Sequence, residues 1–250
     1  ADRLAHCPGV NVLVTSRERL RLRGEYELPI GPLPTPAPAT DLEQPLPIDG
    51  WAGIAAVRLF VERAAEARPG FALTEENAAA VAELCRRLDG LPLAIELAAT
   101  RVKLLSPADL LTWLDPRLPV LIGGPRDLPA RLQTMRDAIA WSHDLLSPAE
   151  QILFRRLAVF AGGCPLKAAN WVTGDGSQVS EDEPNAGKPV TRHPLPVTLD
   201  LVTALVDKSL LRRQEGENGE PRYVMLETIR EYGLDRLAAS GEEPVTRDRH

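Results

Sequence analysis

The sequence predicts a mainly helical protein of 250 residues that begins with the end of an α/β domain. Three patterns predict this. Residues 10–14 are almost continuously apolar, as in a parallel strand that is buried on both faces. From Trp51 to about residue 172, apolar residues recur at helical spacing. Two short runs, 210–213 and 223–226, flank a glycine-containing turn, which is typical of a β-hairpin.

The first segment, residues 1–33, is expected to be the C-terminal end of the α/β domain. A parallel strand needs neighbours that are joined to it by crossover helices. No such pattern follows residue 14, so we expect the partner strands to lie upstream of this chain. Seven prolines lie between Pro29 and Pro47. They indicate an extended connector, and we assign residues 34–53 to a proline-rich linker.

Residues 54–122 are expected to form a bundle of four helices. Thr74 suits the N-cap of the second helix, and Gly90 suits its C-terminal end. Pro92 opens the third helix, because proline is tolerated in the first helical turn. Ser106 caps a short fourth helix.

Residues 126–239 are expected to form a second helical unit that carries the hairpin. Ser147 and Glu150 flank Pro148 as a capping box with proline at the first helical position. A helix over 198–209 precedes the hairpin, and a last helix over 227–239 follows it. Helices followed by a hairpin make this unit a candidate winged-helix domain.

Two segments of this half have no helical or strand pattern. Residues 174–196 are rich in Gly, Ser, Glu, Asn and Pro, and we expect a mobile insertion there. Residues 240–250 are strongly charged, and we expect them to be a linker.

The charge balance excludes several function classes. The net charge is 29 − 35 = −6, which disfavours general binding to nucleic acid or to anionic membranes. No run of 18 apolar residues is present, so we expect no membrane partner. Cys7, Cys85 and Cys164 lie far apart, as expected for reduced thiols in the cytoplasm. The four histidines show no metal-ligand spacing, so we expect no metal site.

No constellation in the sequence predicts catalysis by this chain. A phosphate-binding loop needs glycines and a Gly-Lys pair, but the only such pair, Gly187-Lys188, is followed by Pro189. No apolar strand ends in an acidic pair for Mg²⁺. Residues 142–144 read Ser-His-Asp, but neighbours on one helix point in different directions and cannot align as a catalytic triad.

The candidate recognition helix carries little positive charge. Residues 198–209 contain Asp200, Asp207 and Lys208, which gives +1 − 2 = −1. A helix that reads the major groove usually presents Arg, Lys, Asn or Gln. Arg212 and Arg213, near the hairpin, are the candidate DNA contacts. The charges favour a packing and switching role for this unit.

Several segments resemble one family in the right order. Leu13 to Glu18 resembles the sensor strand of NB-ARC-type STAND ATPases, and Gly90 to Glu96 resembles their GLPL motif. Residues 140–163 and 223–232 are similar to the winged-helix part of bacterial members, which are large LuxR-like or SARP-like transcriptional regulators. The similarity covers nearly the whole chain except residues 174–196.

The resemblance implies a nucleotide site that this chain only partly supplies. Arg17 would read the γ-phosphate beside Thr15 and Ser16, and Pro92 and Leu93 would pack near the adenine. ATP or ADP, with Mg²⁺, would be held mainly by an upstream P-loop half. The parent protein would be a slow ATPase.

One position departs from the pattern of the plant relatives. Where they carry a histidine that contacts the ADP phosphate, this chain has Leu226, which cannot make that hydrogen bond.

The resemblance also implies a function. The chain would be part of an ATP/ADP-dependent switch in a bacterial transcriptional regulator that self-associates in its ATP state. Its partners would be the upstream P-loop half and flanking sensor or effector domains, with DNA bound through another domain. The alternative is a DNA-binding winged-helix protein in which the bundle is a scaffold and nucleotide has no role.

Overall fold

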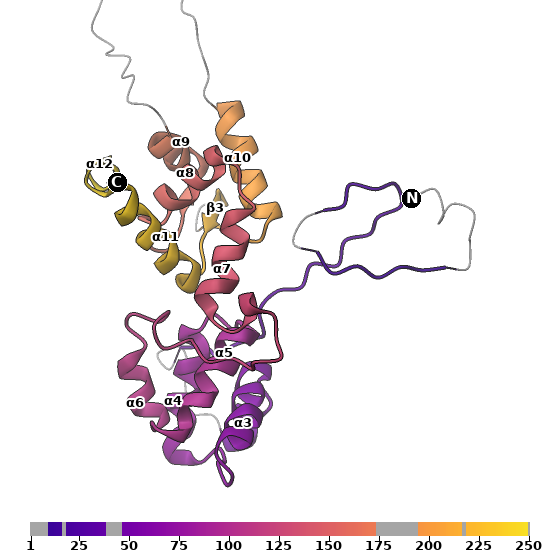
Figure 1. Cartoon of the computed structure of the whole chain (residues 1–250), viewed down its shortest axis with the longest axis vertical. Coiled ribbons are helices and arrows are strands. Elements are labelled where there is room, and N and C mark those ends of the chain that lie inside the picture. The colour runs from indigo at the N-terminus through magenta and orange to yellow at the C-terminus, as the bar shows by residue number, and fades with distance from the viewer. Residues whose placement is uncertain (1–9, 17–18, 39–46, 174–194, 217–218, 250) are drawn as a thin grey trace, which may run out of the picture.

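The computed structural model describes residues 10–16, 19–38, 47–173, 195–216 and 219–249. Its elements form two units that are stacked along the long axis of the molecule, with the N-terminal segment extending to one side (Figure 1). The mainly helical fold that the sequence predicts is confirmed in these residues. No helix in this part of the chain is long and apolar enough to cross a membrane.

The N-terminal segment differs from the prediction. Residues 10–16 are coil, so the strand expected at residues 10–14 is wrong. The apolar run lacks a neighbouring strand among the described residues, and without one an extended segment has no partner for its backbone groups. The side chain of Leu13 is 92% exposed. The described part of the N-terminal segment therefore contains no strand.

The first unit is a helical bundle in which all four expected helices are present. Its elements are α2 (Ile48–Ala52), α3 (Ala55–Ala67), α4 (Glu75–Arg87), α5 (Pro92–Ala99), the 3₁₀-helix η2 (Thr100–Lys103) and α6 (Pro107–Trp113). The expected caps form, since the Asp109 amide donates to Ser106 Oγ at 3.1 Å. Helix α2 was not predicted, because it lies in the proposed linker, where Trp51 packs against Ala78 and Ala82.

The second unit has the element order of a winged helix. Its elements are the 3₁₀-helix η3 (Ala130–Leu132), α7 (Met135–Asp144), α8 (Pro148–Leu157), β1 (Cys164–Pro165), α9 (Leu166–Thr173), α10 (Leu195–Asp207), β2 (Arg212–Glu215), β3 (Pro221–Val224), α11 (Glu227–Ser240) and α12 (Glu243–Arg249). The strands form an antiparallel sheet in the order β1-β3-β2. The hairpin pairs Arg212 with Val224 and Glu215 with Pro221.

The sequence missed two elements of this unit. Strand β1 has only two residues, which is too short for an alternating pattern. Helix α12 forms within residues 240–250, where we expected a linker. Its start is held by Glu242, which accepts hydrogen bonds from Arg155 and Arg156 on α8. The insertion expected at 174–196 falls mostly on residues 174–194, outside the described residues.

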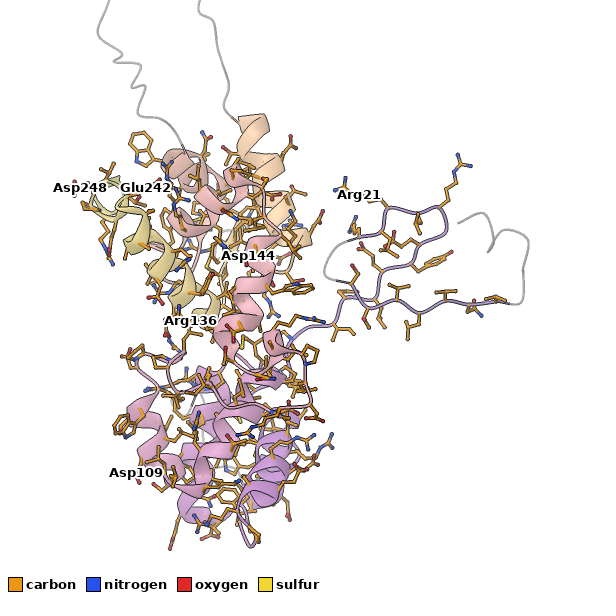
Figure 2. All side chains as sticks on the ribbon, viewed as in Figure 1. Arg21, Asp109, Arg136, Asp144, Glu242 and Asp248 are labelled. Atoms are coloured by element: carbon orange, nitrogen blue, oxygen red, sulfur yellow. The ribbon has the colours of Figure 1, made fainter. Side chains whose placement is uncertain are left out.

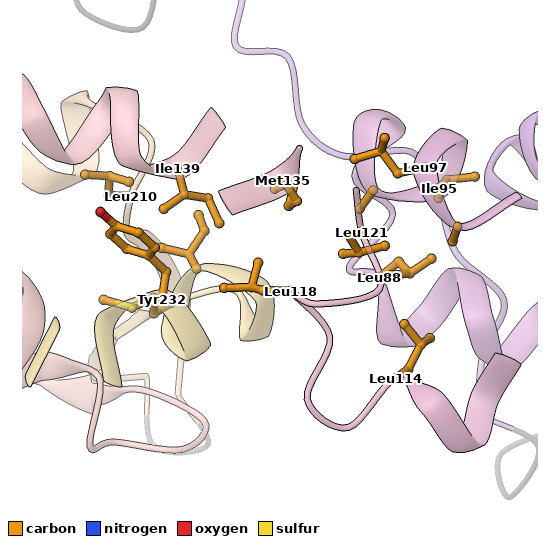
Figure 3. Packing of buried hydrophobic residues seen from close by; sticks show 14 of the residues in the cluster. Leu88, Ile95, Leu97, Leu114, Leu118, Leu121, Met135, Ile139, Leu210 and Tyr232 are labelled. Carbon is orange, nitrogen blue, oxygen red and sulfur yellow. The ribbon is translucent and has the colours of Figure 1, made fainter. Parts of the chain in front are cut away.

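The two units share one continuous apolar core. Figure 3 shows Leu97 and Leu121 on the side of the bundle and Ile139 and Tyr232 on the side of the winged helix, with Met135 between them. Burial of this apolar surface favours contact between the units, but apolar contacts are not directional. Polar contacts across the junction add directional contacts to this apolar packing.

Candidate functional site

Helix α10 takes the place of a recognition helix, and an ion pair fixes it to α8. Both carboxylate oxygens of Glu150 accept from Lys208 Nζ at 2.9 Å, and Glu150 Oε2 also accepts the Ser147 amide at 2.7 Å. Burial acts to raise the pKa of Glu150, but the hydrogen bonds from Lys208 and Ser147 outweigh it and lower the pKa below its usual range.

The outward face of α10 is poor in groups that bind DNA. Val202 and Leu205 are buried, and Leu199, Asp200 and Thr203 are exposed. Helix α10 contains no Lys or Arg. A helix that reads the major groove needs side chains that donate to phosphates and base edges. This face offers an aliphatic group, a carboxylate and a hydroxyl.

The wing is more basic than α10, but two of its arginines, Arg212 and Arg222, are half-buried. Arg213 is exposed and Arg212 is half-buried, where burial lowers the pKa of Arg212. Arg222 donates to the Gly163 carbonyl at 2.6 Å, back toward the domain. Of the two DNA contacts predicted from the sequence, Arg213 therefore has the better access to a ligand.

The residues predicted to bind nucleotide do not come together in the described part of the chain. Thr15 and Ser16 line an open pocket of about 550 Å³ with Trp141, Ser142 and Lys208. Pro92 and Leu93, at the start of α5, are not among the residues that line it. Arg17 lies outside the described residues.

The N-terminal segment reaches the winged-helix unit at one further point. Arg21 lies on this segment (Figure 2), and its Nη2 is 3.8 Å from Asp207 Oδ2 at the end of α10. This contact is exposed on the arginine side, so it contributes little stability.

The residues of the GLPL-like motif have a structural role that the sequence did not predict. The Leu33 amide donates to the Gly90 carbonyl at 2.9 Å. The turn before α5 therefore binds the residue that directly precedes the proline-rich linker. Gly90 has φ = +65°, and a Cβ there would lie 2.2 Å from the Leu33 carbonyl oxygen. Only glycine combines this backbone conformation with so close an approach.

Replacing Gly90 by alanine is expected to destabilise the bundle by about 2–3 kcal/mol, since the left-handed backbone costs about 1–2 kcal/mol and the linker must also move. Urea unfolding measures the change. Gly70→Ala is the matched control, because Gly70 also has positive φ but an added Cβ meets no atom. Equal effects of the two substitutions would contradict the close approach.

The other candidate chemical groups are structural. The His143 ring packs against Phe154 at 5.5 Å and Tyr232 at 5.6 Å, while Ser142 Oγ donates to the Ala138 carbonyl. Ser142 Oγ is therefore bonded to the backbone of its own helix, and Asp144 Oδ1 lies 3.5 Å from His143 Nδ1. Cys85 and Cys164 are buried, and burial raises the pKa of their thiols to about 12 and about 11. No metal-ligand cluster occurs among the residues that the structure describes.

His143 makes the winged-helix unit sensitive to acid. Burial lowers the pKa of His143, and this effect outweighs that of Asp144, whose Oδ1 lies 3.5 Å from His143 Nδ1. The unfolded chain therefore binds a proton at a higher pH than the folded chain, and stability falls as pH drops below about 6.5. We expect the melting temperature to fall more between about pH 7.5 and 5.5 in the wild type than in His143→Phe. The same fall in both proteins would rule out this role.

The decisive comparison concerns the C-terminal unit. Residues 195–238 match the family model of the winged helix-turn-helix domain. The match contains α10, both strands of the hairpin and most of α11.

Longer relatives carry a similar name. A Mycobacterium tuberculosis protein named "Putative HTH-type transcriptional regulator Rv0890c" is 42% identical over 242 residues, and a Mycobacterium bovis counterpart matches equally. A second Mycobacterium tuberculosis protein, "Uncharacterized protein Rv0894", is 36% identical over 239 residues. The matches cover 97% and 96% of this chain but 24% and 53% of the two tuberculosis proteins. The first of these names refers to transcriptional regulation.

Proposed function

We propose that this chain is the helical-bundle and winged-helix part of a bacterial transcriptional regulator, in which α10 does not read DNA bases. The winged-helix match and the name of the 42% identical relative support the first part of this proposal. The outward face of α10, with Leu199, Asp200 and Thr203, carries the second part. Such a regulator works in the cytoplasm, and its base-specific contacts come from another domain.

Selection from a pool of random duplexes with the 250-residue chain tests this proposal. We expect no enriched sequence, and affinities no tighter than the 10⁻⁴–10⁻⁶ M that is typical of non-specific binding. An enriched sequence that binds in the nanomolar range and is weakened by Thr203→Ala would overturn the proposal.

Direct DNA binding by the winged-helix unit is the second candidate function. The family match favours it, and the exposed Arg213 on the wing would supply a phosphate contact. If the winged-helix unit binds DNA directly, its affinity for duplex DNA should fall strongly between about 50 and 200 mM salt. Arg213→Gln would reduce both the affinity and the salt dependence. The control Arg58→Gln, on the exposed surface of α3, would change neither.

The resemblance supports a further proposal about the longer protein, in which ATP or ADP controls the packing of these units and self-association. Nine large apolar side chains are exposed in the N-terminal segment, which is typical of a surface that another domain covers. They are Val10, Val12, Leu13, Val14, Leu20, Leu22, Tyr26, Leu28 and Ile30. Among the described residues, Pro92 and Leu93 do not line the pocket that Thr15 and Ser16 line, and we infer that a P-loop half elsewhere in the protein would hold phosphate and Mg²⁺.

Arg17→Ala in the longer regulator tests this nucleotide proposal. We expect the variant to lose most of the wild-type preference between ATP and ADP, as measured by equilibrium binding. An unchanged preference would remove Arg17 as a sensor of the third phosphate.

A further inference from the structure

Two carboxylates cross the junction between the bundle and the winged-helix unit in opposite directions. Asp89, in the turn after α4, accepts from the amide and the hydroxyl of Thr228 at 3.2 and 2.8 Å. Glu231, on α11, accepts from the amides of Arg117 and Leu118 at 2.8 and 2.9 Å. Each unit thus binds backbone N–H groups of the other.

Asp89 supplies the cap that α11 lacks in its own sequence. The N-cap residue of α11 is Leu226, which makes no side-chain hydrogen bond to the helix. An N-cap side chain normally accepts an amide of the first helical turn. Thr228 is the second residue of α11, and its amide is bound by Asp89, 139 positions earlier in the chain. The first turn of α11 is therefore completed by the bundle.

Asp89 reaches the junction from an uncommon backbone conformation. Asp89 has φ = +57°, a left-handed conformation that aspartate tolerates better than most residues. Burial raises the pKa of this carboxyl, against the effect of the Thr228 hydrogen bonds. The Thr228 hydrogen bonds compensate for the partial burial of this carboxyl, so Asp89 and Thr228 stabilise each other across the junction.

Arg117 joins the two contacts. Its Nε donates to the Arg87 carbonyl at the end of α4 at 3.0 Å, and its Nη1 lies 4.0 Å from Glu227 Oε2 on α11. Its own amide is one of the two that Glu231 binds. The end of α4, the loop after α6 and the first turns of α11 therefore form one polar network.

We propose that Asp89 and Glu231 form an interdomain clamp that sets the angle between the bundle and the winged-helix unit. The shared apolar core holds the units together, and hydrogen bonds to backbone amides add directional contacts across the junction. Loss of the clamp leaves both units folded and lets the angle vary. This inference rests on these contacts and is independent of the DNA and nucleotide proposals.

The test combines Asp89→Gly with Glu231→Ala in the 250-residue chain. Glycine accepts the left-handed backbone and alanine favours a helix, so both substitutions remove a carboxylate without adding backbone strain. Spin labels at Glu62 on α3 and Val245 on α12, both exposed positions, report the distance between the units.

We expect the double variant to broaden this distance distribution at least twofold and to keep the helix content of the wild type. The matched control is Glu83→Ala with Asp235→Ala, which removes two carboxylates that bind arginines within single units. It should leave the distribution unchanged. Asp89→Asn, which keeps an acceptor oxygen and the left-handed backbone, should resemble the wild type.

Two results would overturn the clamp. The distribution of the double variant could equal that of the wild type, which would mean that the apolar core alone sets the angle. Alternatively, circular dichroism could show that the double variant or either single variant loses helix, which would make the carboxylates part of the fold of one unit.

Discussion

Replacing Phe154 by alanine is expected to destabilise the winged-helix unit by about 3–5 kcal/mol. Phe154 lies on α8, and its side chain has no exposed surface. It packs against His143 and Tyr232, and α11 passes so close that a Cβ at Gly233 would lie 3.5 Å from the Phe154 ring. The helices cannot close around the missing ring, so a cavity adds to the lost burial.

Urea unfolding followed by circular dichroism measures this effect. Trp171→Ala is the matched control, because Trp171 is also a large aromatic residue of this unit but is 58% exposed. We expect the control to cost about 0.5 kcal/mol or less. A cost below about 1 kcal/mol for Phe154→Ala would contradict the packing of α8 against α7 and α11.

Replacing Lys208 by methionine is expected to cost about 3 kcal/mol, because it leaves the Glu150 carboxylate buried without its partner. The two side chains are only 16% and 10% exposed, so water cannot replace the lost ion pair. Methionine retains much of the apolar stem of lysine, which separates the loss of charge from the loss of packing.

The pH dependence of the cost of Lys208→Met identifies the lost ion pair as the cause of that cost. The wild-type pKa of Glu150 is lowered, so the pair stabilises the fold above about pH 4.5 and this contribution disappears as pH falls further. Without Lys208, burial instead raises the pKa of Glu150 and favours its protonation. The difference in unfolding free energy between the wild type and Lys208→Met should therefore become smaller as the pH falls from about 7 to about 4.

Two further variants serve as controls. Glu150→Gln combined with Lys208→Met should cost less than the sum of the single changes, by about 1–3 kcal/mol. Arg247→Met breaks the exposed pair with Glu243 and should cost about 0.5 kcal/mol. Additive effects, or a cost for Lys208→Met as small as that of the exposed pair, would show that the α8–α10 pair does not stabilise the fold.

Local signals in the sequence predicted the helices well. Ser147 and Ser106 cap helices that begin at the next residue, because a capping box depends only on residues three positions apart. The hairpin was found for a similar reason, since its two strands are joined by a short turn. The winged-helix interpretation rested on these elements, and the family match supports it.

Contacts between distant segments could not be predicted in this way. The strand expected at residues 10–14 depended on neighbours that the described chain does not supply. Asp89 caps α11 from the other unit, and nothing near Leu226 in the sequence indicates that its cap comes from elsewhere. Lys208 was counted as a charge on the recognition helix, but the structure pairs it with Glu150.

The central claim is that α10 lies in a winged helix without reading DNA. Hydroxyl-radical footprinting of Leu199, in a regulator that contains this chain and is bound to its own DNA site, tests this claim most directly. Leu199 is 45% exposed on the outward face of α10, where a bound major groove would cover it. We expect DNA to leave the oxidation of Leu199 unchanged. Protection of Leu199 on DNA binding would contradict it.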